Sequence, residues 1–129
     1  NIFEAHGMTP FLKFCERTKN KKGAGIKELF ETDQNFTKAI DLAKSAQSND
    51  IEHPKIDKLV EILRDVKSKV LIFSSYRDSV DVIQKKLVGM NIAAEILIGK
   101  AGKTGLKQQE QIETVQRFRD GITRALVAT

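Results

Sequence analysis

The chain has 129 residues, 40% of them hydrophobic and 30% charged, which fits one compact domain, or a domain with an appendage, around a small core. Its single cysteine, Cys15, excludes an internal disulfide and favours an intracellular protein, and no apolar run approaches the roughly 18 residues of a membrane span. The formal charge of +5 permits an anionic partner such as nucleic acid but does not demand one, since a solvated face often carries such charge.

Residues 1 to about 50 predict helices and no strands. Thr9 is expected to cap a helix that begins at Pro10 and places Cys15 on its apolar face. Asp33 is expected to cap a later helix of the same segment. Residues 45–50 are polar and typical of turns, so we expect a linker there.

The pattern changes after Pro54, which starts another helix, and becomes strand, helix, strand, loop, helix, strand. Strands alternating with helices predict an α/β fold with a parallel sheet, whose ligands bind beyond the carboxyl ends of the strands. The apolar run at 70–73 predicts a strand that is covered on both faces. The other expected elements are strands at 92–98 and 124–129, a helix capped by Asp78 or Ser79, and a helix at 107–120 that Gly121 ends in the left-handed conformation.

The loop at 99–106 contains Gly-Lys-Ala-Gly-Lys-Thr, which invites interpretation as an ATP-binding P-loop. Such a loop needs a glycine at position 97, where this chain has Leu97, and Gly105 delays the helix that should follow at once. A basic loop is therefore the favoured reading. Lys100 and Lys103 would either bind a phosphate of a nucleic-acid backbone or only aid solubility.

Other candidate groups indicate little chemistry. His6 and His53 have no cysteine pair beside them, so a metal site is not expected, and both are read as surface or capping residues. Arg77 follows a strand at the functional edge, beside Tyr76, where it could reach a phosphate. The alternative is that it pairs with Asp78 or Asp81.

Several segments together resemble one family of enzymes. The sequence VLIFSSYRDSV at 70–80 looks like motif IV of superfamily 2 helicases, in the variant of the Hef, Fanconi anaemia M-type and Mph DNA helicases. The segments 105–111, 117–121 and 126–129 resemble the same family's approach to motif V. The match is good over 52–129 and looser over 1–51.

The resemblance implies a partial RecA-like parallel sheet, β-α-β-α-β, preceded by an α-helical segment. Residues 1–51 would be part of a thumb-like helical insert, and 52–129 the N-terminal part of the second RecA-like domain. The parent protein would be an ATP-dependent helicase or translocase that acts on forked or branched DNA, uses ATP and Mg²⁺, and, in archaeal members, carries a nuclease domain. We expect this chain to be a piece of that protein that lacks the nucleotide site and contains no catalytic residue.

The resemblance also implies contacts to nucleic acid. Ser75 and Arg77 would touch the strand, Gly99 would let the backbone approach a phosphate, and Thr129 would open motif V. Gln108 would begin a Gln-x-x-Arg element in which Gln111 replaces the arginine. With the two lysines of the loop, the predicted nucleic-acid-binding residues are Ser75, Arg77, Gly99, Lys100, Lys103, Gln108 and Thr129. An RNA helicase and a non-catalytic binding or adaptor module are the alternatives.

Overall fold

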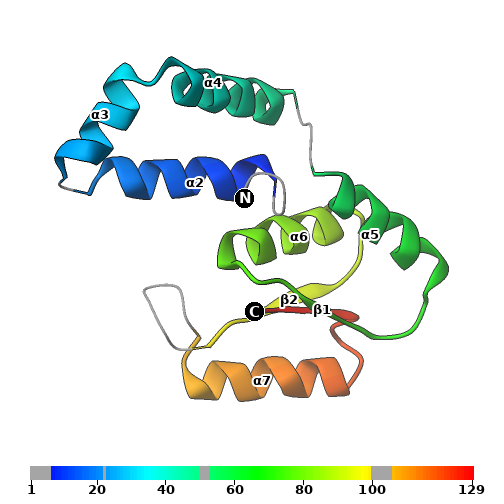
Figure 1. Cartoon of the computed structure of the whole chain (residues 1–129). Coiled ribbons are helices and arrows are strands. Elements are labelled where there is room, and N and C mark those ends of the chain that lie inside the picture. The colour runs from blue at the N-terminus through cyan, green and yellow to red at the C-terminus, as the bar shows by residue number, and fades with distance from the viewer. Residues whose placement is uncertain (1–6, 22, 50–52, 100–105) are drawn as a thin grey trace. The chain divides into compact units, whose positions relative to one another are not determined.

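The computed structural model describes residues 7–21, 23–49, 53–99 and 106–129. The chain divides into two compact units, Asn1–Asp57 and Lys58–Thr129. In the first unit the described residues form α2 (Met8–Lys19), α3 (Ala24–Thr32) and α4 (Gln34–Ser48), and α5 (Pro54–Asp65) crosses the boundary between the units (Figure 1).

The first unit is held together by the apolar faces of α2 and α4. Met8, Leu12 and Ala43 are buried there, with Phe11 and Ile40 packed against them. Cys15 is 4% exposed, which confirms that it belongs to the apolar face of its helix.

The helix α2 begins two residues earlier than predicted, at Met8 and not at Pro10, because Gly7 and not Thr9 precedes it. The backbone of Gly7 has φ +86°, and a Cβ placed there would lie 2.9 Å from the Cβ of His53. Glycine is therefore required at position 7 for two separate reasons. The Thr9 hydroxyl instead accepts a hydrogen bond of 3.0 Å from Nε2 of Gln47, so the predicted cap was wrong and the side chain links α2 to α4.

The prediction for α4 was right at its start and wrong at its end. The Asp33 carboxylate accepts hydrogen bonds of 3.0 Å from the backbone N–H groups of Asn35 and Phe36, which confirms the cap. The helix then continues to Ser48 through the residues predicted as a linker. Ala46 of this segment packs against the apolar cluster between α2 and α4. This packing outweighs the polar, turn-forming composition of the segment.

The second unit alternates strands and helices as predicted. After α5 come β1 (Val70–Phe73), α6 (Arg77–Gly89), β2 (Ala94–Leu97), α7 (Gln108–Arg119) and β3 (Ala125–Ala128). The three strands are parallel and their order in the sheet is β1-β3-β2. This arrangement confirms the α/β fold and the β-α-β-α-β order.

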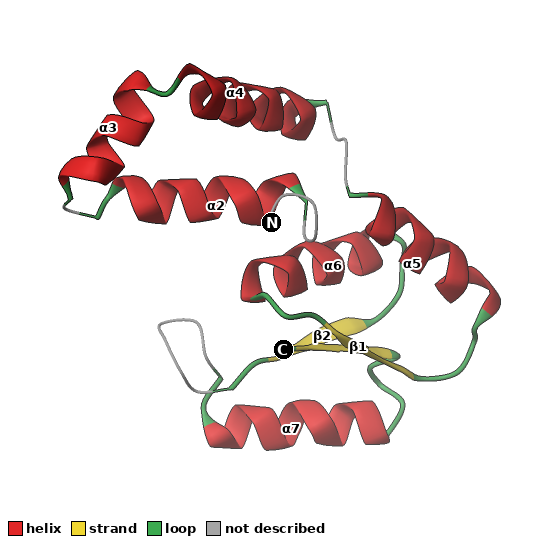
Figure 2. Ribbon diagram, viewed as in Figure 1, coloured by secondary structure: helices red, strands yellow, loops and turns green. Residues whose placement is uncertain are grey.

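The two connections cross opposite faces of the sheet. The chain passes over β3 to reach β2 and then returns, so two right-handed crossovers put α6 on one face and α7 on the other. Figure 2 shows the strands between these two helices. The central strand β3 is consequently buried along its whole length.

The core of this unit lies on the face covered by α6. Its buried residues come from α5, α6, β2, β3 and the segments next to them: Leu63, Val80, Leu87, Ile92, Ala94, Ile98, Ala125 and Val127. On β1, however, Leu71 is 54% and Phe73 74% exposed, while Val70 and Ile72 pack against the core. The prediction that β1 is covered on both faces was wrong. The helix α7 packs over β2, so the same face of the sheet is left uncovered at β1.

Two local predictions near the helix ends had different outcomes. Tyr76 precedes α6, so neither Asp78 nor Ser79 caps it, and Ser79 is buried at 6% exposure. Gly121 has φ +79°, which confirms the left-handed turn after α7. Within the described ranges, none of the helices has the length and apolar character to span a membrane.

Candidate nucleic-acid interface

The carboxyl ends of the three strands lie level with one another. Phe73 pairs with Ala128, and Ala128 with Leu97, so the residues that follow each strand emerge at one edge of the sheet. The backbone N–H of Ser74 extends this pairing by donating to the carbonyl oxygen of Ala128 at 2.9 Å. Topology thus brings to this edge the predicted residues Ser75, Arg77, Gly99 and Thr129.

Arg77 has a contact that neither of its two sequence readings anticipated. Nη2 of its guanidinium donates a hydrogen bond of 3.0 Å to the carbonyl oxygen of Gly99, 22 residues further along the chain. The bond joins the first residue of α6, which follows β1, to the backbone just after β2, and β1 and β2 lie on either side of the central strand. One guanidinium carries five N–H donors, so this contact uses only part of its capacity.

Gly99 is exposed, and its glycine identity is not needed by the fold around it. Its φ is not in the left-handed region, and the described part of the chain places no atom within 4 Å of a Cβ built there. A side chain at this position would therefore extend into open space above the sheet edge.

The start of α7 is fixed by bonds that connect it to the end of β2. The backbone N–H of Leu106 donates to the carbonyl oxygen of Ile98 at 3.3 Å, and Nε2 of Gln111 donates to the Leu106 carbonyl at 2.9 Å. The Glu110 carboxylate accepts from the backbone N–H of Lys107 at 2.6 Å and so caps the helix. Gln111, which occupies the arginine position of the resembled motif, thus contacts the protein's own backbone.

Gln108 is the first residue of α7 and is exposed. Together with Leu97 it lines a groove of about 440 Å³ that continues along α7 past Gln111. Ser75 and Thr129 are exposed at the sheet edge. The predicted residues Lys100 and Lys103 lie outside the described residues.

A charged cluster on the other side of α7 was not foreseen from the sequence. Glu95 of β2 and Arg117 of α7 form an ion pair of 2.7 Å, and the Thr123 hydroxyl donates to the same carboxylate. Hydrogen bonds from Arg117 and then Thr123 lower the pKa of Glu95 against the opposing effect of its burial. The cluster fixes α7 on the sheet, and the one signal for it in the sequence is a lone charge within the apolar run 92–98.

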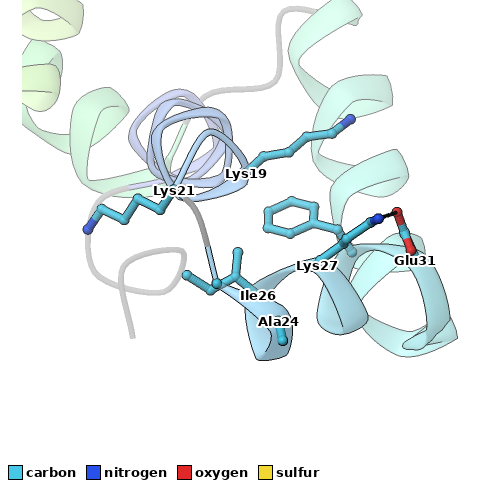
Figure 3. Close-up of a pocket in the computed structure, with 8 residues that line it drawn as sticks. Lys19, Lys21, Ala24, Ile26, Lys27 and Glu31 are labelled. Atoms are coloured by element: carbon cyan, nitrogen blue, oxygen red, sulfur yellow. Dashed lines mark ion pairs between the residues drawn. The ribbon is translucent and has the colours of Figure 1, made fainter.

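The first unit carries a basic hollow of about 620 Å³ between the end of α2 and α3. Lys19, Lys21 and Lys27 line it with the apolar side chains of Ile26 and Phe30. Figure 3 shows Lys21 extending away from Lys19 and Lys27, and Lys27 approaching Glu31 at 4.0 Å. These lysines are suited to anions that approach from solvent, because both partners of the Lys27 ion pair are more than half exposed.

The described residues do not fit a magnesium–nucleotide site. Leu97 lies within β2 and not in a loop, so the backbone cannot fold around a phosphate as a P-loop does. No group of three or more acidic, histidine or cysteine side chains that could hold a metal occurs in the ranges described. His53 instead uses Nδ1 to accept a hydrogen bond of 3.1 Å from the backbone N–H of Lys55, which confirms it as a capping residue.

The chain is similar to curated DNA helicases along nearly its whole length. It is 32% identical over 148 aligned residues to the ATP-dependent DNA helicase mph1 of Neurospora crassa, covering 99% of this chain and 13% of that protein. It is also 30% identical to the putative ATP-dependent DNA helicase fml2 of Schizosaccharomyces pombe, over 99% of this chain and 19% of that protein. A relative from Methanocaldococcus jannaschii, named a putative ATP-dependent RNA helicase, is 30% identical over 92% of this chain and 16% of its own length. The chain therefore spans less than a fifth of these relatives.

The structure is similar to the crystal structure of the Pyrococcus furiosus Hef helicase domain. The two superpose with a TM-score of 0.74 at 31% sequence identity, over 99% of this chain and 28% of that chain. This similarity confirms that the parallel sheet is part of a RecA-like fold. Residues 54–129 match the family described as the helicase conserved C-terminal domain. The chain belongs to that helicase family, and its relatives include the Mph and Hef helicases identified from its motifs.

Proposed function

We propose that the chain is part of an ATP-dependent DNA helicase or translocase that acts on forked or branched DNA during repair and replication-fork processing. The observation that carries this proposal is the meeting of Ser75, Arg77, Gly99 and Thr129 at the carboxyl edge of a parallel sheet in a helicase-family chain. Residues 52–129 supply the first half of the second RecA-like domain. Residues 1–51 supply part of a helical insert.

In this proposal the sheet edge follows the sugar–phosphate backbone of one strand. Ser75 and Thr129 offer hydroxyl groups, Gly99 offers an exposed backbone, and Gln108 offers an amide at the start of α7. Lys100 and Lys103 supply charge from the connection between β2 and α7. Such contacts recognise phosphate and sugar rather than base sequence, so binding should be independent of sequence and sensitive to salt.

The parent protein binds ATP and Mg²⁺ and hydrolyses ATP, with the nucleotide held by residues outside this chain. A nuclease domain further along the parent chain is part of the same proposal, as the resemblance of the motifs to those of archaeal family members implies. The proposed protein is intracellular, cytoplasmic in a prokaryote and nuclear in eukaryotic relatives, and the free cysteine supports this proposal. The isolated chain should show no ATP hydrolysis above a buffer control, and measurable hydrolysis would contradict this assignment.

Binding of a fluorescent single-stranded oligothymidine to the isolated chain, followed by anisotropy, tests the proposed surface. Each phosphate contact that is lost should reduce the slope of log affinity against log salt by about 0.7. We expect Lys100→Gln and Lys103→Gln to weaken binding and reduce this slope, whereas Lys85→Gln on the exposed side of α6 should do neither. Binding that is selective for sequence or unaffected by salt would argue against the proposal.

An RNA helicase is the second candidate, because the relative from Methanocaldococcus jannaschii carries that name. Competition between forked DNA, duplex DNA and duplex RNA for the parent protein separates the two, and we expect forked DNA to compete best. The remaining alternative is a non-catalytic adaptor module. It would be favoured if the parent bound nucleic acid without ATP-dependent movement.

A further inference from the structure

Side chains of the second unit bind the backbone at Gly99, just after β2, and at Leu106, just before α7. The Gly99 carbonyl accepts a hydrogen bond of 3.0 Å from Arg77. The Leu106 carbonyl accepts one of 2.9 Å from Gln111. The Ile98–Leu106 backbone bond of 3.3 Å connects these two places.

These bonds matter because they restrain the backbone just beyond the end of β2. Gly99 is exposed and lies two residues beyond the last residue of β2. The Arg77 bond is charge-assisted, which makes it stronger than a bond between neutral groups. Arg77 is also well anchored, since it is the first residue of α6 and the buried Val80 lies one turn further along that helix.

We infer that Arg77 and Gln111 are positioning residues for nucleic acid, which act through the Gly99 and Leu106 carbonyls and not through contact with a phosphate. This inference rests on the proposed function, since it concerns how the sheet edge is shaped to receive a strand. Arg77 holds the exposed backbone of Gly99 beside the carboxyl ends of the strands. Gln111 sets the start of α7, where Gln108 is exposed. A charged side chain and a neutral one thus perform the same task.

Salt dependence distinguishes positioning from direct contact. A cation that neutralises a phosphate releases counterions, so its removal lowers the salt slope by about 0.7 for single-stranded nucleic acid. A residue that only positions the backbone weakens binding by a similar factor at every salt concentration. The slope is then unchanged, and for neutral Gln111 it cannot change by loss of charge.

The experiment measures anisotropy of a labelled oligothymidine over a salt series with the whole chain and the variants Arg77→Gln and Gln111→Ala. We expect each variant to lose affinity by roughly three- to tenfold with the slope of the unmodified chain. The matched controls are Arg64→Gln, an exposed arginine of α5, and Gln109→Ala, whose exposed side chain bonds Glu113 and does not line the groove. Both controls should bind within about twofold of the unmodified chain.

Denaturant unfolding, followed by the fluorescence of the single tyrosine, must show each variant fully folded under the binding conditions. The ¹⁵N heteronuclear NOE of Gly99 should decrease in Arg77→Gln, which a general loss of stability would not confine to that residue. A slope reduced by about 0.7 in Arg77→Gln would identify a direct phosphate contact and overturn the inference. Unchanged affinity in both variants would overturn it as well while leaving the proposed function intact. Absence of binding by the unmodified chain would overturn both.

Discussion

Replacing Gly7 with alanine should increase the population of the unfolded, open form of the first unit more than any other glycine-to-alanine change within that unit. Gly7 precedes α2 with φ +86°, and a Cβ there would lie 2.9 Å from the Cβ of His53. Both atoms belong to rigid parts of their side chains, so rotation about a side-chain bond cannot relieve the contact. Backbone strain and overpacking therefore add.

The magnitude follows from these two effects. A left-handed backbone costs a residue with a Cβ about 1–2 kcal/mol, and overpacking of a filled site costs about 1–3 kcal/mol. Their sum, about 2–5 kcal/mol, corresponds to an increase on the order of 30- to 5,000-fold in the population of the open unit. Gly25→Ala is the matched control, because Gly25 lies inside α3 with open space around a built Cβ. That change should stabilise by about 0.5–1 kcal/mol.

Cys15 provides the assay without any added probe. It is the only cysteine of the chain, it is 4% exposed, and it lies in α2. Burial, and to a smaller extent the neighbouring Glu16, raise the pKa of its thiol, so the closed form reacts slowly with a thiol reagent. The labelling rate then reports how often the first unit opens.

The reasoning fails if Gly7→Ala is labelled no faster than the unmodified chain. It also fails if Gly25→Ala accelerates labelling as much as Gly7→Ala does. A further comparison, Gly121→Ala in the second unit, isolates the backbone term. Gly121 has φ +79° with no described atom near a built Cβ, so about 1–2 kcal/mol should be lost there, measured by unfolding of the second unit.

Three further changes test single interactions. Asp33→Ala removes both cap bonds of α4 and should destabilise the first unit by about 1 kcal/mol by Cys15 labelling, an effect that Asp41→Ala at an exposed helix position should not show. The pKa of Glu95 is lowered in the folded chain, so its contribution to stability is complete above the ordinary glutamate pKa of about 4.3 and is lost as the pH falls through the folded pKa. Glu95→Gln should therefore lower the stability measured by tyrosine fluorescence at neutral pH and make it depend less on acid. An unchanged acid dependence would refute this. Ser79→Ala should leave stability unchanged or raise it, since the buried hydroxyl has no partner among the described residues, and a clear loss in denaturant unfolding would reveal a missed bond.

The order of helices and strands follows from the sequence, but the surroundings of each element do not. The run Val70–Phe73 is apolar throughout, and this pattern predicts two covered faces. Phe73 is nevertheless 74% exposed, because coverage depends on where α7 crosses the sheet. The end of α4 was misjudged for a related reason, since its polar residues lie on a helix that packs against α2.

The candidate site shows the same limit. The rule that ligands lie beyond the carboxyl ends of parallel strands placed Ser75, Arg77, Gly99 and Thr129 at one edge, and the sheet register brings them there. The partner of Arg77 lies 22 residues away, at the end of a different strand, and no local pattern indicates it. A motif can therefore name the residues of an edge without revealing which of them contact each other.

The position of β3 has a consequence for how the chain acquires its structure. β1 and β2 do not pair with each other, and each pairs with β3, whose residues are 125–128. During synthesis from the N-terminus, the strand with which both of them pair in this chain is made last. Both β1–β3 and β2–β3 pairings close loops of more than twenty residues, so formation of the sheet is slow compared with formation of the helices. Until β3 is made, the apolar strand that carries Leu71 and Phe73 lacks this pairing, and an unpaired apolar strand favours aggregation.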